Sequence, residues 1–163
     1  MGSNRRLPCS AVLLAPGDRA PTFILDDIAT GEQVTNPWTA GPAVVAFIKV
    51  TCPVCKLVAP LVQALADAGA RVTAIGQDPA PSLAAYAEQF GQRVPTVTEP
   101  PPYRVSNAYG ITTVPTLYLV DHGGIVRHAV GGWDRVRWNA VAAAVGAPAL
   151  SADGDGLPSY RPG

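Results

Sequence analysis

The sequence predicts a single α/β domain in which helices flank a central mixed β-sheet that carries an N-terminal β-hairpin extension. Residues 43–50 form a continuous apolar run rich in β-branched side chains, which is typical of a strand buried on both faces. From Pro53 onward, apolar residues recur at spacings of three and four, which indicates a helix directly after that strand. A turn at residues 121–124 then joins two strand-like segments ahead of a last helix. This order of elements favours helices on both faces of one sheet.

The other elements are placed by turn-forming residues that separate the apolar stretches. We expect strands at residues 22–26, 33–35, 71–76, 94–98, 116–120 and 125–130, and helices at 81–90, 103–109 and 133–145. The first two strands are joined by a short turn, which predicts the hairpin. The helix from Pro53 contains Pro60, which is expected to kink it, and Gly69 is expected to end it. On a helix over 133–145, Trp133 and Trp138 would not share one face.

Length and composition are those of one globular domain, and we expect the protein to be a monomer. The chain has 163 residues, of which 48% are apolar, enough for one core. We expect a flexible lead-in at 1–15, the domain at 16–147 and a tail at 148–163. Twelve basic and twelve acidic residues balance to a formal net charge of zero, which argues against a nucleic-acid partner.

The sequence predicts no membrane span and a cytoplasmic location. No apolar run approaches the ~20 residues that a transmembrane helix needs. The apolar stretch at 10–15 is short and lacks a small-residue cleavage site, so no signal peptide is expected. The alternative is an extracytoplasmic or membrane-anchored protein whose leader has been removed, because the start Met-Gly-Ser resembles a cloning remnant.

Two of the three cysteines, Cys52 and Cys55, form a Cys-x-x-Cys pair, whereas Cys9 stands apart. Three cysteines are too few for a disulfide scaffold. A zinc site would need further ligands, and His122 and His128 lack ligand spacing, so we expect no metal and no cofactor beyond a redox-active Cys52–Cys55 disulfide. The alternative to redox chemistry is that Cys52 and Cys55 are inert thiols of the core. Their position where a strand passes into a helix disfavours this, because such a corner is exposed.

The position of the pair assigns different roles to the two thiols. Cys52 lies where the strand ends and the helix begins, and free backbone amides and the helix dipole stabilise a thiolate there. Cysteine pKa values in such places fall from about 8.5 toward ~3.5–7.5. Pro53 suits the first helical turn. We therefore expect Cys52 to be the catalytic nucleophile, and Cys55, one turn further on, to be the catalytic resolving thiol.

The run at 52–56, Cys-Pro-Val-Cys-Lys, resembles the active-site segment of the thioredoxin superfamily. Val114-Pro115-Thr116 resembles the proline segment that lies beside the cysteine pair in that family. The start at 17–23 with its hairpin, and the inserted segment around 78–109, resemble the redoxin and TlpA-like branch. The resemblance spans residues 16–147. It implies a thioredoxin-like fold and disulfide exchange with a protein disulfide or dithiol substrate and an upstream electron donor or acceptor.

The resemblance also implies that the peptide bond before Pro115 is cis and lies beside the cysteine pair. A proline has no amide to donate to a sheet. The backbone of Val114 would then be free to pair with an extended substrate. The residues expected to contact substrate are Thr51, Pro53, Val54, Val114 and Pro115.

The sequence departs from the thioredoxin pattern at two positions near the pair. Thr51 stands where many members have an aromatic residue, and Ala46 stands where many thioredoxins have a buried acid. Such an acid would assist proton transfer at the second thiol. Glu88 and Glu99 of the inserted segment are the candidates to replace it.

Two other functions use the same fold. A peroxiredoxin-type thiol peroxidase would need Thr or Ser three residues before its reactive cysteine, where this chain has Lys49, and a proline upstream within the run that here forms an unbroken strand. A non-catalytic binding or assembly module is the third hypothesis, because a fold does not dictate a function. The intact Cys52–Cys55 pair argues against the module.

Overall fold

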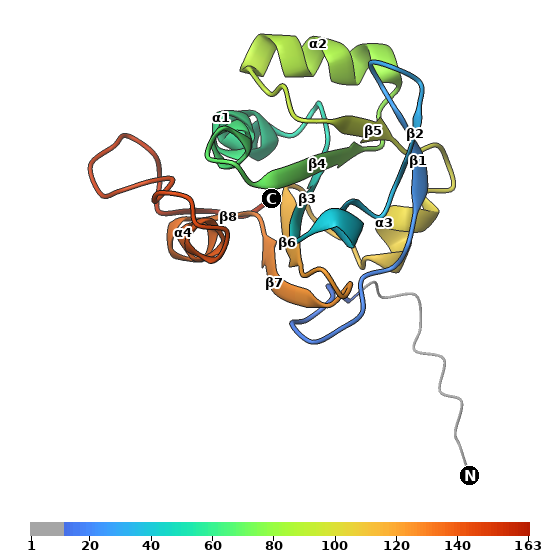
Figure 1. Cartoon of the computed structure of the whole chain (residues 1–163). Helices are drawn as coiled ribbons and strands as arrows, with labels where there is room; N and C mark the ends of the chain where they lie inside the picture. Colours follow the sequence, from blue (N-terminus) through green and yellow to red (C-terminus); the bar gives the residue numbers. More distant parts are fainter. Residues whose placement is uncertain (1–11) are drawn as a thin grey trace.

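The computed structural model describes residues 12–163, so Cys9 and most of the expected lead-in lie outside the described residues. Seven strands form one mixed sheet in the order β2-β1-β5-β4-β3-β6-β7, and β8 pairs with β9 in a separate two-stranded ladder (Figure 1). The strands are β1 (Ile24–Asp27), β2 (Gln33–Thr35), β3 (Ala43–Ile48), β4 (Arg71–Gly76), β5 (Thr96–Thr98), β6 (Thr116–Val120), β7 (Val126–Gly131), β8 (Trp133–Asp134) and β9 (Tyr160–Arg161). The predicted mixed sheet and the N-terminal hairpin, which β1 and β2 form, are both confirmed.

The apolar run of the sequence becomes β3, an interior strand of the sheet. β3 pairs in parallel with β4 and antiparallel with β6. Its side chains alternate between two separate core clusters, with Val44, Ala46 and Ile48 in one and Ala43, Val45 and Phe47 in the other. A strand buried on both faces therefore has no polar position, which explains the unbroken apolar run.

Helices cover both faces of the sheet, as the order of elements predicts (Figure 1). On one face lie α1 (Pro53–Asp67), α2 (Ala80–Phe90) and α4 (Arg135–Ala144), whose buried residues belong to the first cluster. On the other face lie the 3₁₀ helix η1 (Pro37–Ala40) and the short α3 (Arg104–Ala108), which pack against the second cluster. None of the helices within residues 12–163 is long and apolar enough to cross a membrane.

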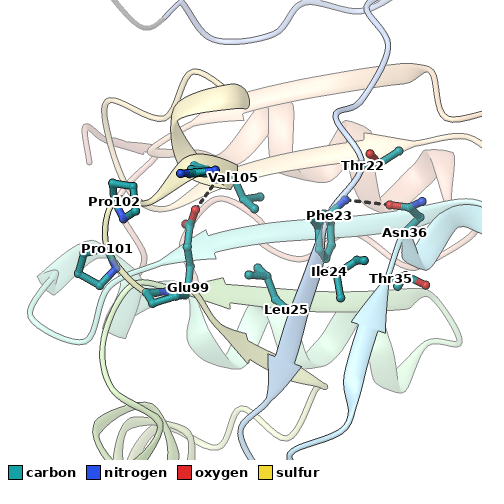
Figure 2. A pocket seen from close by; sticks show the side chains of 12 residues that line it. Thr22, Phe23, Ile24, Leu25, Thr35, Asn36, Glu99, Pro101, Pro102 and Val105 are labelled. Atoms are coloured by element: carbon teal, nitrogen blue, oxygen red, sulfur yellow. Dashed lines mark hydrogen bonds between the residues drawn. The ribbon is translucent and has the colours of Figure 1, made fainter.

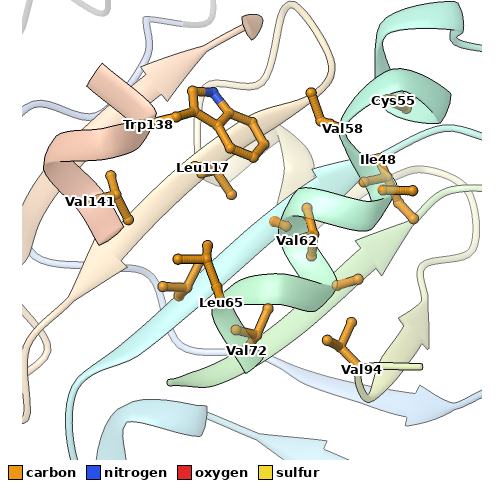
Figure 3. Packing of buried hydrophobic residues seen from close by; sticks show 14 of the residues in the cluster. Ile48, Cys55, Val58, Val62, Leu65, Val72, Val94, Leu117, Trp138 and Val141 are labelled. Carbon is orange, nitrogen blue, oxygen red and sulfur yellow. The ribbon is translucent and has the colours of Figure 1, made fainter. Parts of the chain in front are cut away.

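Helix α1 carries the cysteine pair and is fixed by its apolar face. Val58, Val62 and Leu65 lie over the strands, with Trp138 and Val141 of α4 beside them (Figure 3). The expected Pro60 does lie inside α1, on its exposed side. Because this face is anchored along its whole length, the start of the helix has a fixed position relative to the sheet.

The last helix begins later than the sequence predicts. Residues 133–134 form β8, and α4 begins only at Arg135, with the Asp134 side chain accepting the Arg137 amide as its N-cap. Trp133 therefore does not follow the helical spacing to Trp138. The two indole rings meet edge to face at a centroid distance of 5.3 Å and are fully buried, so the prediction that they lie on different faces was wrong.

Residues 148–163 are held on the domain by contacts that the sequence analysis did not foresee. The Arg135 guanidinium donates to Ser151 Oγ at 2.9 Å and to the Leu157 carbonyl at 2.7 Å. The Trp133 indole donates to the Pro158 carbonyl at 2.6 Å. This segment thus follows a defined path back toward the centre of the molecule, where Figure 1 marks the chain end.

Candidate active site

Cys52 lies in the tight turn between β3 and α1. Its amide donates to the carbonyl of Lys49 at 3.1 Å, which closes the turn. Cys52 is the N-cap of α1, and its sulfur accepts the amide of Cys55 at 3.2 Å. Pro53 is the first residue of the helix, where its missing amide leaves no unpaired donor. The Cys52 sulfur is therefore held at the positive end of the α1 dipole, half-buried and reachable from solvent.

Cys55 lies one turn further on and faces the core. It is fully buried in the same cluster as Ala46 of β3, the position where a carboxyl group is absent. Burial raises the pKa of the Cys55 thiol most, the neighbouring Cys52 raises it further, and the negative charge of Asp78 adds a smaller increase. The two thiols therefore have different surroundings. The Cys52 sulfur is half-buried at the N-terminus of α1, whereas the Cys55 sulfur is buried in the core.

Asp78 is a residue of the site that the sequence analysis missed. Its carboxylate accepts the amide of Val50 at 2.9 Å, and so ties the turn before Cys52 to the loop after β4. The parallel register explains this position, because Ile48 and Gly76 are opposite each other at the ends of β3 and β4. The residues two positions further on each strand are therefore neighbours. The sequence did contain a signal for this residue, since Asp78 is an acid that closely follows the buried strand β4.

The peptide bond between Val114 and Pro115 is cis, as the resemblance implied. The Cys52 thiol donates to the carbonyl of Val114 at 3.2 Å, which brings the two distant motifs into direct contact. Among the hydrogen bonds between residues 12–163, none uses the amide of Val114. The predicted juxtaposition of the cysteine pair and this proline turn is confirmed.

The other residues expected to contact substrate differ in exposure. Thr51 and Pro53 are exposed on either side of Cys52, and Val114 is half-buried. Val54 packs in the core at 6% exposure, and Pro115 is buried as well. The exposed residues beside the nucleophile are therefore Thr51 and Pro53, with the half-buried Val114 next to them.

Neither glutamate proposed to replace the missing acid is placed to do so. Glu88 is exposed on α2. Glu99 is buried, but its carboxylate accepts the amides of Val105 and Ser106 and the Ser106 hydroxyl, so it caps the start of α3 (Figure 2). Position in the inserted segment alone did not distinguish a helix cap from a proton acceptor. Asp78, whose carboxylate accepts the Val50 amide, is the acid whose charge acts on Cys55.

A hollow of about 920 Å³ lies between the N-terminal hairpin and the proline-rich loop before α3 (Figure 2). Phe23, Leu25, Pro101 and Val105 contribute to its lining. None of its lining residues belongs to the turn that carries Cys52. A smaller hollow of about 190 Å³ borders the site itself and is lined in part by Lys49 and Val114.

Tyr86 of α2 supports the cysteine helix from the side. Its hydroxyl donates to the carbonyl of Cys55 at 2.8 Å, and burial raises its pKa. We expect Tyr86→Phe to lower the free energy of unfolding by about 1 kcal/mol, because a buried carbonyl loses its hydrogen bond. Denaturant unfolding measures this loss. Tyr160→Phe is the control at an exposed tyrosine, and equal effects of the two substitutions would contradict the prediction.

The raised pKa of Cys55 predicts that the reduced protein loses stability in alkali. The folded state keeps this thiol neutral, whereas the unfolded chain ionises it with a pKa of about 8.5. The stabilising contribution is therefore complete below pH ~8.5 and decreases above it. We expect the free energy of unfolding to be lower by about 1.4 kcal/mol at pH 9.5 than at pH 7.5. Cys55→Ser, unfolded under the same reducing conditions, should lack this decrease.

Comparison with known proteins places this geometry in a family. Residues 16–129 match the model of the AhpC/TSA family. The chain belongs to that family. The redoxin resemblance noted in the sequence is thus confirmed for most of the domain, including the segments that carry Cys52, Cys55 and Pro115.

The chain is a distant homologue of thiol–disulfide oxidoreductases. It is 27% identical over 124 residues to the thiol-disulfide oxidoreductase ResA of Geobacillus thermodenitrificans, covering 73% of this chain and 71% of that protein. The structure of a thio-disulfide isomerase from Thermus thermophilus superposes with a TM-score of 0.65 at 25% identity, covering 82% of this chain and 99% of that one. The thioredoxin domain of BVU-2223 from Bacteroides vulgatus gives a TM-score of 0.71 at 21% identity, covering 81% and 99%, which establishes the thioredoxin-like fold.

Proposed function

We propose that this protein is a thiol–disulfide oxidoreductase that exchanges disulfides with protein substrates through Cys52 and Cys55. The observation that supports this most is the contact of the Cys52 sulfur with the Val114 carbonyl, at the N-terminus of α1 and beside the cis-proline turn. A reachable thiol is thereby presented next to a backbone edge that suits an extended chain. The similarity to oxidoreductases named for this reaction supports the same function.

The first step of the proposed reaction uses the position of Cys52. Its thiolate attacks one sulfur of the substrate disulfide, so that a Cys52–substrate disulfide forms and the other substrate sulfur leaves as a thiolate that takes up a proton. The Cys55 amide, which already contacts the Cys52 sulfur at 3.2 Å, stabilises negative charge there. The amide of Val114, which makes no hydrogen bond within residues 12–163, could pair with an extended substrate at the same point.

The second step requires Cys55 to lose its proton although burial raises its pKa. We assign the acceptor role to the Asp78 carboxylate, whose charge acts on this thiol. The Cys55 sulfur then attacks Cys52, forming the intramolecular disulfide and releasing the second substrate thiol. Two electrons pass from the protein to the substrate disulfide, and the reverse sequence oxidises a dithiol. An upstream electron donor or acceptor must restore the starting state.

The test of this function is turnover with a protein disulfide. The reduced protein should reduce insulin disulfides in the presence of a dithiol donor, and equilibration with glutathione should convert Cys52 and Cys55 together into one disulfide. A reduction potential toward −270 mV would assign the reducing direction and one toward about −120 mV the oxidising direction. A protein that neither turns over insulin nor forms this disulfide would be a binding or assembly module.

Lys49, three residues before Cys52, distinguishes this protein from a thiol peroxidase. Lys49, where a hydroxyl residue would be required, is exposed and uses its carbonyl to close the Cys52 turn. We therefore expect hydrogen peroxide to consume the thiols slowly and at a similar rate to an unstructured thiol. Rapid peroxide reduction with a thiol donor would favour the peroxidase instead.

A further inference from the structure

Residues 160–163, which we call the strap, lie across the chain that connects β7 to α4. The strap opens with β9, which runs antiparallel to β8 with Arg161 opposite Trp133. It then passes over Gly132 so closely that a Cβ built there would approach the Arg161 carbonyl oxygen to 2.8 Å and the Gly163 nitrogen to 2.9 Å. The backbone of the strap is therefore in contact with the domain along its length.

The far end of the strap reaches the candidate active site. A Cβ built on Gly163 would collide with the hydroxyl of Thr113 and with the carbonyl of Val114. That same carbonyl accepts the thiol of Cys52 at 3.2 Å. The strap and the nucleophile thus both lie against the carbonyl of Val114. Pro115, which borders this group, is buried.

The strap lies on the surface and uses its backbone rather than its side chains. All four of its residues are exposed, and the ring of Tyr160 is 58% exposed. An extended chain that pairs antiparallel with a strand edge is also the form in which a polypeptide substrate binds by β-strand addition. The strap therefore has the form of a bound substrate segment, and it can leave without opening the core.

We propose that the strap occupies the path by which an extended polypeptide reaches Cys52, so that the strap and a protein substrate exclude each other. The identity of the competitor rests on the proposed function, whereas the covering of Cys52 does not. Only a glycine fits at the last position of the strap as it lies, because a Cβ on Gly163 would collide with Thr113 and Val114.

The direct test removes the strap and measures access to Cys52. A chain ending at Ser159, with Cys9→Ser in the background, keeps the Trp133–Pro158 hydrogen bond and the hydrogen bond from the Arg135 amide to the Ser159 carbonyl. Labelling of reduced Cys52 by a bulky maleimide should become about five- to tenfold faster if the strap covers the site in roughly 80–90% of molecules. An unchanged labelling rate would overturn the proposal.

Two substitutions in the 163-residue chain distinguish covering of Cys52 by the strap from an effect of the strap's charge. Gly163→Ala introduces the colliding Cβ, so it should displace the strap and raise the labelling rate in the same direction as the truncation. Arg161→Gln keeps the backbone pairing with Trp133 and removes only the charge, so its labelling rate should equal that of the parent. If Arg161→Gln reproduced the full effect of truncation, the acceleration would be electrostatic and the strap proposal would fail.

Insulin reduction then tests the strap proposal and the proposed function separately. The peptide Ser-Tyr-Arg-Pro-Gly, added to the truncated protein, should slow both labelling and insulin reduction. Faster labelling after truncation in a protein that never reduces insulin would uphold the strap and reject the proposed function. Equal labelling of all variants together with normal insulin reduction would reject the strap and uphold the function.

Discussion

Cys55→Ser is expected to convert the protein into a trap that accumulates a mixed disulfide with its substrate. The variant keeps Cys52 at the N-terminus of α1 but lacks the buried thiol that would release the substrate. Incubation with insulin or an extract of oxidised proteins should give nearly stoichiometric adducts at Cys52, seen on non-reducing gels and mapped by mass spectrometry. Turnover should fall to the background rate, because the second step has no nucleophile.

The matched variant is Cys52→Ser, again with Cys9→Ser in the background. It should trap substrate at least about tenfold more slowly than Cys55→Ser. Burial raises the pKa of Cys55 and so lowers its thiolate fraction at neutral pH, and its sulfur is also shielded from large substrates. Equal trapping by the two variants would reverse the assignment of nucleophile and resolving thiol.

Asp78→Asn is expected to slow the second thiol exchange by about 10²-fold and to leave the first unchanged. The substitution removes the proposed proton acceptor, and general base catalysis contributes about 10²–10⁴-fold. The amide still has an oxygen that can accept the Val50 amide, so the turn before Cys52 should be preserved. Reaction with Ellman's reagent resolves the two steps, because attack by Cys52 releases one chromophore and attack by Cys55 releases the second.

Glu88→Gln is the control for this experiment, since Glu88 is an exposed carboxylate that the sequence also offered as a proton acceptor. It should leave both phases unchanged. The Asp78 charge also raises the pKa of Cys55, so its removal lowers that pKa and by itself favours the thiolate. A faster second phase in Asp78→Asn would therefore mean that Asp78 acts only through its charge and does not accept the proton.

The fold could be predicted where local pattern and burial coincide. β4 and β6 have the predicted bounds, and α1 follows the expected apolar spacing, because each is defined by its own apolar face. β8 was missed because a strand of two residues is too short to show an alternating pattern. Its extended form depends on pairing with Tyr160 and Arg161, which lie far along the chain. The contacts that anchor residues 148–163 are likewise long-range, so their polar composition predicted only a tail.

The site could be predicted only in part for a similar reason. Cys52 and Cys55 are neighbours in sequence, so their spacing revealed the pair, and the resemblance supplied the cis bond at Pro115. Asp78 comes next to them through the register of two parallel strands, which spacing along the chain does not express. Glu99 illustrates the opposite error, since a buried acid in the inserted segment serves α3 rather than the thiols.

The pairing of β3 with β4 has a consequence for how this chemistry can vary. Cys52 belongs to the turn after β3 and Cys55 to the first turn of α1, while the carboxylate that acts on Cys55 belongs to the loop after β4. Exchange of residues 77–79 would therefore change the acidity of the resolving thiol without altering Pro53 or Val54 between the cysteines. The loop is a second, separately replaceable segment for adjusting the redox equilibrium, which a comparison limited to the four residues of the Cys-x-x-Cys motif would overlook.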